Sequence, residues 1–298
     1  MIAIEARHDD VILAGSLWQP TGTPRALLVM HPGSGPSDRD NDVLFPPIRE
    51  VLLANGIAVS SFDKRGVGES TGSWLEADIL TQATDLAASV AAVQDQLPGV
   101  PTGLFGHSQG GWVVLEAANR IAVEFVVTNS GPGVSPRVQE EYSTGNQLRG
   151  HDASDQRTPD AAALFATIMD WLSEGVPFGT ADARLREPDR AAALEVLIDA
   201  GAFVPQDEAL WNFAATIIDY DPASALRQLR VPLLALFGGD DTVVPVDASA
   251  ERFRASCPDE LLTLLVFPGG DHRIQTAGEA FVAGYLDAIV DFILSTVG

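Results

Sequence analysis

One serine of the sequence stands in a pattern that exposes a hydroxyl group for nucleophilic attack. Ser108 lies between Gly106 and Gly110, after an apolar run at residues 102–105 and before a helical pattern. A sharp turn between strand and helix strains the serine backbone, and the two glycines let strand and helix approach closely. The first amides of the helix favour negative charge beside the hydroxyl. We expect Ser108 to be a nucleophile; the simpler alternative is a glycine-rich turn with a solvated serine.

An acid and a base follow two later strand-like runs. Asp241 comes after the apolar residues 231–237, and His272 comes after residues 261–267. Ligands of open α/β sheets bind at the carboxyl ends of the strands, so the three side chains are expected to meet there. Histidine can take the proton of the Ser108 hydroxyl, and the aspartate can fix the histidine tautomer and stabilise its charged form.

These assignments have competitors in the same loops. The alternative for Asp241 is an acid that caps its loop, with Asp240 and Asp271 as rival acids, and the alternative for His272 is a surface histidine. Of the five histidines, His31 and His107 also follow strand-like runs, but His107 directly precedes the nucleophile and is expected to point away from it. An acid, a base and a serine that all fall at strand ends favour the catalytic interpretation.

The composition of the chain argues against some classes of binding partner. The 298 residues are 46% hydrophobic and carry a net charge of -23, which repels nucleic acid and anionic membrane surfaces. No apolar run reaches the roughly 18 residues of a membrane span. The first residues are acidic where a signal peptide would be basic, so a cytoplasmic location is expected.

The sequence contains no pattern that predicts a metal or a cofactor. It lacks the His-Glu-x-x-His motif, a cluster of cysteine and histidine, and a Gly-Lys-Ser/Thr loop for phosphates. The single cysteine, Cys257, cannot form an internal disulfide and is expected to be a small buried hydrophobic residue.

Strand-like and helical patterns alternate over most of the chain, which predicts an α/β fold with a mostly parallel central sheet and helices on both faces. Between residues 131 and 229 no buried-strand run occurs, and helical patterns replace it. We therefore expect a core formed by residues 1–130 and 230–298 and a helical cap, or lid, inserted after the sixth strand. Six aromatic residues of this insertion either line a pocket or, as we favour, form its own small core: Phe165, Trp171, Phe178, Phe203, Trp211 and Phe213.

The motifs and their order resemble the α/β-hydrolase superfamily over essentially the whole chain. The order serine, aspartate, histidine is the order of that fold. Gly238-x-x-Asp241-x-x-Val244-Pro245 resembles its acid loop, and Gly270-Asp271-His272 resembles its histidine loop. The stretches HPGSGPSDRD and FDKRGVG are similar to a bacterial branch of esterases and serine-aminopeptidase-like hydrolases.

The resemblance implies an oxyanion hole made of two backbone amides. One is the amide of Gln109, directly after the nucleophile. The family usually has His-Gly after the third strand, but Pro32 intervenes here and has no amide hydrogen. We therefore assign the second donor to the Ser34 amide, with Gly33 as the alternative.

The implied reaction is acyl transfer through an acyl-enzyme on Ser108. We expect a carboxylesterase-type hydrolase that cleaves carboxylic esters of small or medium acyl groups, because esters are easier to cleave than amides. An aminopeptidase or acyl-peptide/amide hydrolase on the same triad is the alternative reaction. A non-catalytic ligand-binding protein on a hydrolase scaffold is the alternative from another class. The expected partner is a small-molecule ester or amide, without cofactor, metal, nucleic acid or membrane; no oligomeric state is predicted.

Overall fold

The computed structural model describes residues 1–151, 157–278 and 280–298. Residues 152–156, which belong to the predicted insertion, and residue 279, which belongs to a closing helix predicted at 278–296, lie outside the described residues. The structure shows the closing helix as α11 (Tyr285–Val297), which begins later in the chain than predicted.

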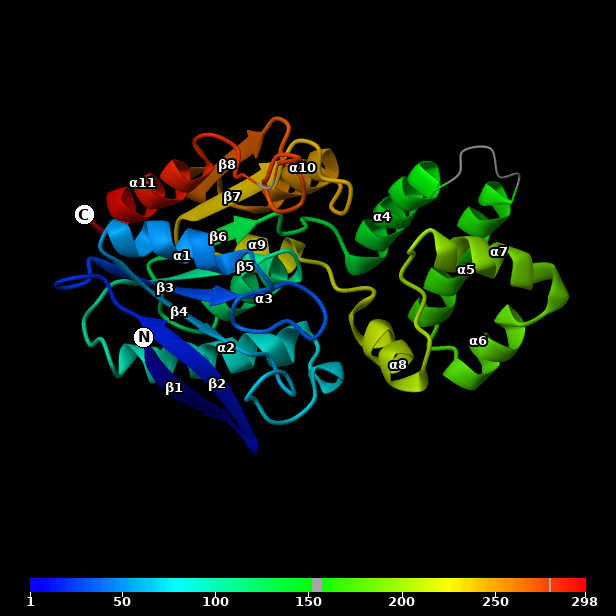
Figure 1. Ribbon diagram of the computed structural model, residues 1–298, viewed down its shortest axis with the longest axis horizontal. Helices are drawn as coiled ribbons and strands as arrows, with labels where there is room; N and C mark the ends of the chain where they lie inside the picture. Colours follow the sequence, from blue (N-terminus) through cyan, green and yellow to red (C-terminus); the bar gives the residue numbers. More distant parts are fainter. Residues whose placement is uncertain (152–156, 279) are drawn as a thin grey trace. The chain divides into compact units, whose positions relative to one another are not determined.

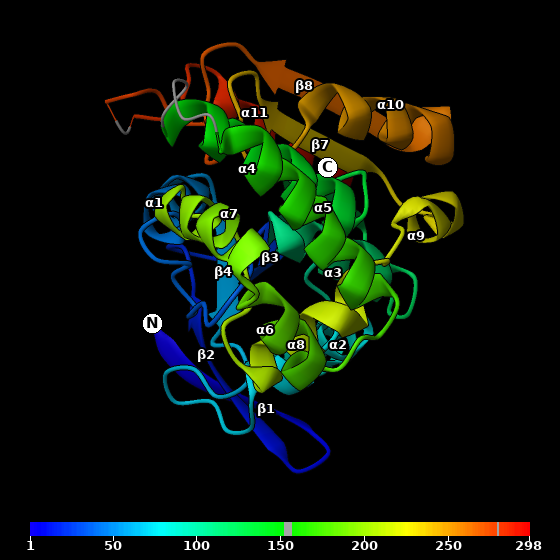
Figure 2. The same ribbon diagram turned by 90° about the vertical axis from the view of Figure 1, so that its right-hand side faces the viewer.

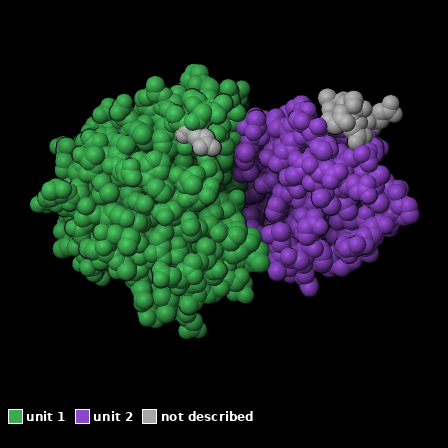
Figure 3. All heavy atoms as spheres, viewed as in Figure 1, with its two compact units in different colours: residues 1–133, 222–241, 246–298 green, residues 134–221, 242–245 purple. Residues whose placement is uncertain are grey.

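The chain forms two compact units, coloured separately in Figure 3. Unit 1 consists of Met1–Gly133, Pro222–Asp241 and Val246–Gly298, and unit 2 consists of Val134–Asp221 and Thr242–Pro245. Unit 2 is therefore shorter than the predicted insertion at its carboxyl end, because α9 (Ala223–Gln228) belongs to unit 1. The role of unit 2 as a cap stays a prediction.

Unit 1 is built on an eight-stranded sheet with the strand order β1-β2-β4-β3-β5-β6-β7-β8. β1 and β2 are antiparallel to their neighbours and the other pairs are parallel, so the prediction of a mostly parallel sheet is confirmed. Figure 2 shows β7 and β8 towards one edge of the sheet and β1 and β2 towards the other. The strands are β1 (Ile2–His8), β2 (Val11–Trp18), β3 (Ala26–His31), β4 (Ile57–Phe62), β5 (Thr102–His107), β6 (Phe125–Asn129), β7 (Leu233–Gly238) and β8 (Leu262–Phe267).

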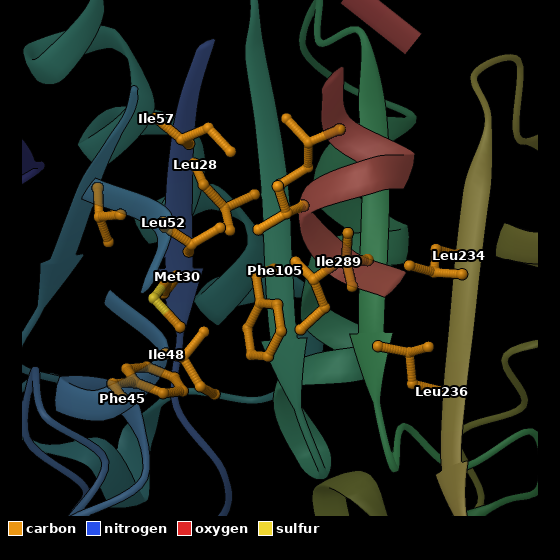
Figure 4. Packing of buried hydrophobic residues seen from close by; sticks show 14 of the residues in the cluster. Leu28, Met30, Phe45, Ile48, Leu52, Ile57, Phe105, Leu234, Leu236 and Ile289 are labelled. Atoms are coloured by element: carbon orange, nitrogen blue, oxygen red, sulfur yellow. The ribbon is translucent and has the colours of Figure 1, made fainter. Parts of the chain in front are cut away.

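The central strands are buried along their whole length because helices cover both faces of the sheet. Every residue of β3, β5 and β7 is buried, whereas the edge strand β8 is partly exposed. On one face, side chains of α1 (Phe45–Ala54) and α11 pack on β3, β4, β5 and β7, as Figure 4 shows for the labelled residues. The other face carries α2 (Ile79–Gln94), α3 (Gln109–Ala118), α9 and α10 (Val246–Ser256) (Figure 2).

The parallel strands bring their carboxyl ends to the same edge of the sheet. The loops after β3, β4, β5 and β8 leave from this edge, and so does the loop after β7 (Figure 1). These loops contain the residues that the sequence predicts to be chemically active. The sheet therefore determines which residues can meet.

Unit 2 contains helices with their own apolar core. Phe165, Trp171 and Trp211 are buried in this core, and Phe178 and Phe203 pack against it, which agrees with the favoured interpretation of these aromatics. The helices are α4 (Pro136–His151), α5 (Thr158–Ser173), α6 (Phe178–Leu185), α7 (Pro188–Asp199) and α8 (Glu208–Ile217). Among the described residues, no helix has the length and apolar character needed to cross a membrane.

Candidate active site

The turn at Ser108 joins β5 to α3. Ser108 has φ 53° and ψ -123°, a combination that residues with a side chain rarely adopt. A Cβ atom on Gly106 would lie 2.1 Å from the carbonyl oxygen of Gly110, so only glycine fits there. Gln109 is the first residue of α3, and its N–H therefore has no partner within the helix. The turn thus presents a serine hydroxyl next to an available backbone donor.

The loops after β7 and β8 form an acid–base pair. Asp241 is 3% exposed, and its Oδ2 lies 2.8 Å from Nδ1 of His272. A carboxylate at this distance accepts the Nδ1 proton and leaves Nε2 with a free lone pair. The structure therefore brings together two of the three residues predicted to form the triad, with the histidine in the tautomer that can accept a proton.

The competing acids lie in other environments. Asp240 is exposed. Asp271 holds its own turn, since its Oδ1 accepts the backbone N–H groups of Arg273 at 2.8 Å and Gln275 at 2.9 Å. In the described part of the chain, neither carboxylate hydrogen-bonds to the imidazole of His272, whereas Asp241 does.

His107 connects the serine turn to the loop of His272. The two imidazole rings lie against each other with their centroids 5.0 Å apart. Nε2 of His107 donates to the backbone carbonyl of His272 at 3.4 Å, and Nδ1 accepts from Nδ2 of Asn41 at 2.9 Å. Burial, followed by the nearby His272, holds the pKa of His107 well below its usual value. His107 is therefore a neutral residue that links Asn41 to the His272 loop next to Ser108.

The loop after β3 passes beside the serine. A Cβ atom on Gly33 would lie 3.5 Å from Cβ of Ser108, which shows how close the two backbones are. The Gly33 N–H is engaged, because it donates to Oδ1 of Asn41 at 3.0 Å. For the N–H of Ser34, by contrast, no acceptor is found within the described residues. Of the two candidate donors in this loop, Ser34 has the available amide.

His31 and Cys257 lie outside this constellation. His31 faces Gln82 with 3.4 Å between Nε2 and Oε1, and burial, together with the charge of Lys64, lowers its pKa to about 3. Cys257 is buried as predicted, and burial raises the pKa of its thiol to about 11. Over the described ranges, no three histidine, cysteine or acidic residues are grouped so that they could hold a metal ion.

Comparison with known proteins identifies the family of this chain. Residues 24–277 match the model of the family described as "Serine aminopeptidase, S33". This span includes the serine turn, the acid–base pair and unit 2. The chain belongs to the S33 serine aminopeptidase family. It is accordingly a hydrolase with the α/β-hydrolase fold.

The chain is also similar, at low sequence identity, to individual named proteins. The monoacylglycerol lipase of Mycolicibacterium smegmatis is 25% identical over 285 residues, which cover 94% of this chain and 91% of the lipase. Among solved structures, the proline iminopeptidase of Mycobacterium smegmatis aligns with a TM-score of 0.64 at 17% identity, covering 99% of both chains. The esterase Pf2001 of Pyrococcus furiosus aligns with a TM-score of 0.62 at 18% identity, covering 100% of this chain and 93% of the esterase. The two structural matches show the shared fold.

Two residues of this S33 family member escaped the sequence analysis, Asn41 and Lys64. Asn41 adopts a left-handed backbone conformation with φ 47° and links Gly33 to His107. Lys64 is buried, and its Nζ donates to the Gly33 carbonyl and, at 2.9 Å, to Oε1 of Gln109. Lys64 lies within one of the stretches that resemble the bacterial hydrolases and Asn41 directly follows the other, but no spacing rule links them to the serine.

Proposed function

We propose that the protein is a serine hydrolase that cleaves carboxylic esters of small or medium acyl groups. The observation that carries the proposal is the 2.8 Å contact between His272 Nδ1 and Asp241 Oδ2, in loops beside the strained turn of Ser108. In this proposal Ser108, His272 and Asp241 form the catalytic triad.

The reaction begins with attack of the Ser108 Oγ on the ester carbonyl carbon. A bond forms between Oγ and carbon, the Oγ proton passes to Nε2 of His272, and the carbonyl π electrons move to its oxygen. Asp241 stabilises the imidazolium that results. His272 then returns the proton to the leaving alcohol, and an acyl-enzyme remains on Ser108. Water, activated by His272, releases the acid and restores the serine.

The amides of Gln109 and Ser34 are the proposed oxyanion hole. Gln109 directly follows the serine in sequence, and Ser34 follows Gly33, whose backbone passes close to Cβ of Ser108. Preorganised donors of this kind stabilise the charge that develops in the transition state, and loss of one typically costs about 10²–10³ in kcat.

Ester cleavage is favoured over amide cleavage by the lipase relative, whose name describes an enzyme of carboxylic esters and which aligns over 94% of this chain. The family description instead names an aminopeptidase. Both reactions use the same triad, so rates on ester and amide substrates are needed to distinguish them.

The deciding experiment measures hydrolysis of p-nitrophenyl acetate, butyrate and octanoate and of monobutyrin by the wild type and by Ser108→Ala. An aminoacyl p-nitroanilide runs in parallel. We expect ester turnover, highest for acetate or butyrate, and a loss of about 10⁴-fold or more in kcat for the variant.

Each part of the proposal can be contradicted separately. Equal rates for wild type and Ser108→Ala would exclude Ser108 as nucleophile and bring forward the non-catalytic alternative. A higher kcat/KM for the anilide than for any ester would support the peptidase. If p-nitrophenyl palmitate, tested in addition, were cleaved faster than both butyrate and octanoate, the proposed preference for small or medium acyl groups would be contradicted.

A further inference from the structure

Lys64 occupies an unusual position for a lysine. It is the single lysine in the sequence, in which every other one of the 18 basic residues is an arginine. It is the second residue after the end of β4 and is only 7% exposed. Burying an amine is costly, because the charged form loses its hydration. A buried lysine in a chain that otherwise uses arginine therefore calls for a specific explanation.

The hydrogen bonds of Lys64 point to the site rather than to an ion pair. Its Nζ donates to the carbonyl oxygen of Gly33 and to Oε1 of Gln109. Burial is the cause that lowers the pKa of Lys64, to about 7, and no salt bridge with a carboxylate forms in the described part of the chain. The amine thus bridges the loop after β3 and the first residue of α3.

The bond to Gly33 fixes the direction of the next amide. A trans peptide is planar, with its C=O and the following N–H on opposite sides. Because the Gly33 carbonyl faces the buried amine, the Ser34 N–H faces away from it. The other side of Gly33 is held as well, since its own N–H donates to Asn41 Oδ1 at 3.0 Å. Hydrogen bonds therefore hold both peptide groups that flank Gly33.

Glycine makes such restraint necessary. A Cβ atom on Gly33 would lie 3.2 Å from Nδ1 of His107, tighter than most real contacts, so glycine suits the space. Glycine also has the lowest barrier to other backbone conformations. Rotation of the 33–34 peptide would exchange the Ser34 N–H for the Gly33 carbonyl oxygen, and a carbonyl oxygen repels an oxyanion.

We propose that Lys64 is a positioning residue of the oxyanion hole: its ε-amino group holds the Gly33 carbonyl and so keeps the Ser34 N–H directed at the substrate oxyanion. This rests on the proposed function, because it concerns the same site. Lys64 itself touches neither substrate nor reacting atoms. It acts through the 33–34 peptide and, through Gln109, on the start of α3.

The test compares Lys64→Met, Lys64→Gln and wild type with p-nitrophenyl butyrate. Methionine is similar in size but donates no hydrogen bond, whereas glutamine is one bond shorter and keeps an N–H donor. We expect kcat to fall about 100-fold or more in Lys64→Met, with KM within about threefold, because one oxyanion donor is lost. The kcat of Lys64→Gln should lie between those of Lys64→Met and wild type.

A matched control is Arg65→Gln, which removes the neighbouring cation of the same loop. Arg65 pairs with Asp85, with 2.6 Å between Nε and Oδ2, and within the described residues it makes no hydrogen bond to the 33–34 peptide. We expect this variant to be less stable but to keep its kcat at a temperature where it is folded. Circular dichroism and thermal unfolding check that each variant is folded.

A second readout separates positioning from general structural support. A trifluoromethyl ketone adds the serine oxygen to its carbonyl and forms a hemiketal oxyanion, whereas the matching methyl ketone binds largely as the neutral ketone. We expect Lys64→Met to raise the inhibition constant of the trifluoromethyl ketone by the same factor by which it lowers kcat/KM. The inhibition constant of the methyl ketone should stay within about threefold of the wild-type value.

The outcomes distinguish this inference from the proposed function. If wild type does not cleave the ester, or cleaves it with the same kcat as Ser108→Ala, the proposed function is refuted, and the inference that rests on it is refuted with it. If wild type is active and folded Lys64→Met keeps kcat within about threefold, or weakens both ketones equally, the positioning role is refuted while the function stands. If Lys64→Met does not fold, Lys64→Gln takes its place in both measurements. A fall in kcat that is matched by weaker inhibition by the trifluoromethyl ketone alone would support the positioning role; weaker inhibition by both ketones, or no fall in kcat, would refute it.

Discussion

The loops at the carboxyl edge of the sheet and the helices of unit 2 are stabilised by different interactions. In the loops, buried polar groups such as Asn41, Lys64 and His107 hydrogen-bond to backbone atoms of the same loop or of a neighbouring one. In unit 2, apolar side chains such as Leu197 and Trp211 pack together. Hydrogen bonds to backbone have one correct geometry, whereas apolar contacts tolerate small shifts.

This difference predicts where single substitutions act. A substitution in the loops should turn a hydrogen-bond donor away from the site or prevent two backbone segments from lying close together. Either change should have a large effect on activity or folding. A change in unit 2 should alter stability in proportion to the volume removed. The following substitutions test the contrast, beginning with the largest expected effect.

Gly106→Ala should have the largest effect. The new Cβ atom would lie 2.1 Å from a backbone oxygen, which no side-chain rearrangement can relieve. We expect a loss of about 4 kcal/mol or more in the free energy of unfolding, or failure to fold. Urea unfolding and soluble yield measure it. A folded, active Gly106→Ala would show that the turn is less constrained than its geometry indicates.

Leu197→Ala should reduce the stability of unit 2. Leu197 is fully buried in the core of that unit, and such truncations cost about 2–5 kcal/mol. Because each unit has its own core, we expect faster hydrogen exchange in α5 and α7 and unchanged exchange in β3 and β5. Equal acceleration in both units would mean that they unfold together, and the contrast between them would then be wrong.

Lys64 should make stability depend on pH. Burial lowers its pKa from 10.5 to about 7. Between these values the unfolded chain binds a proton that the folded protein does not, so the free energy of unfolding rises with pH, by up to about 1.4 kcal/mol per pH unit. Below about pH 7 both states are protonated, and the cost of the buried charge is fully present.

The measurement is urea unfolding of wild type and Lys64→Met at pH 7, 8 and 9. The difference in the free energy of unfolding between the two proteins separates the effect of Lys64 from that of other titrating groups. We expect wild type to gain stability relative to Lys64→Met as pH rises. Because the sequence holds one lysine, lysine labelled with ¹⁵N gives a single Nζ signal that reports the pKa directly. A pKa near 10.5 would contradict the burial of the amine.

Gly145→Ala should have the smallest effect and the opposite sign. Gly145 lies within α4, and a Cβ atom there would meet only Nη1 of Arg149, at 3.4 Å. Alanine favours a helix over glycine by about 0.5–1 kcal/mol, so we expect a slight gain in the free energy of unfolding. A loss above about 1 kcal/mol would show that this helix surface is more constrained than the contacts indicate.

The sequence predicted the sheet well because its signal is local. Residues 26–30 of β3 are all apolar, which is typical of parallel strands buried on both faces. α4 has little signal in the sequence because its residues are mostly polar, and Leu148 alone represents it in the apolar core of unit 2. α6 and α9, with eight and six residues, have too few turns for a periodic pattern.

The candidate site was only partly predictable. Asp241 and His272 follow recognisable motifs, and the structure brings them together, while their catalytic roles stay predictions. Asn41 and Lys64 escaped because their partners lie 66 and 31 positions away in His107 and Gly33. A bond to a backbone carbonyl leaves no side-chain pattern at the accepting residue, so sequence spacing cannot reveal it.

The chain of contacts from Gly33 through Asn41 and His107 to the His272 carbonyl has a consequence for protein engineering. Loops from three different strands share it, so none of them is an independent module. Grafting the histidine loop of a distant relative would import a backbone shaped for other neighbours. Libraries that recombine these loops should therefore exchange them as one block, with Asn41 and His107 kept together.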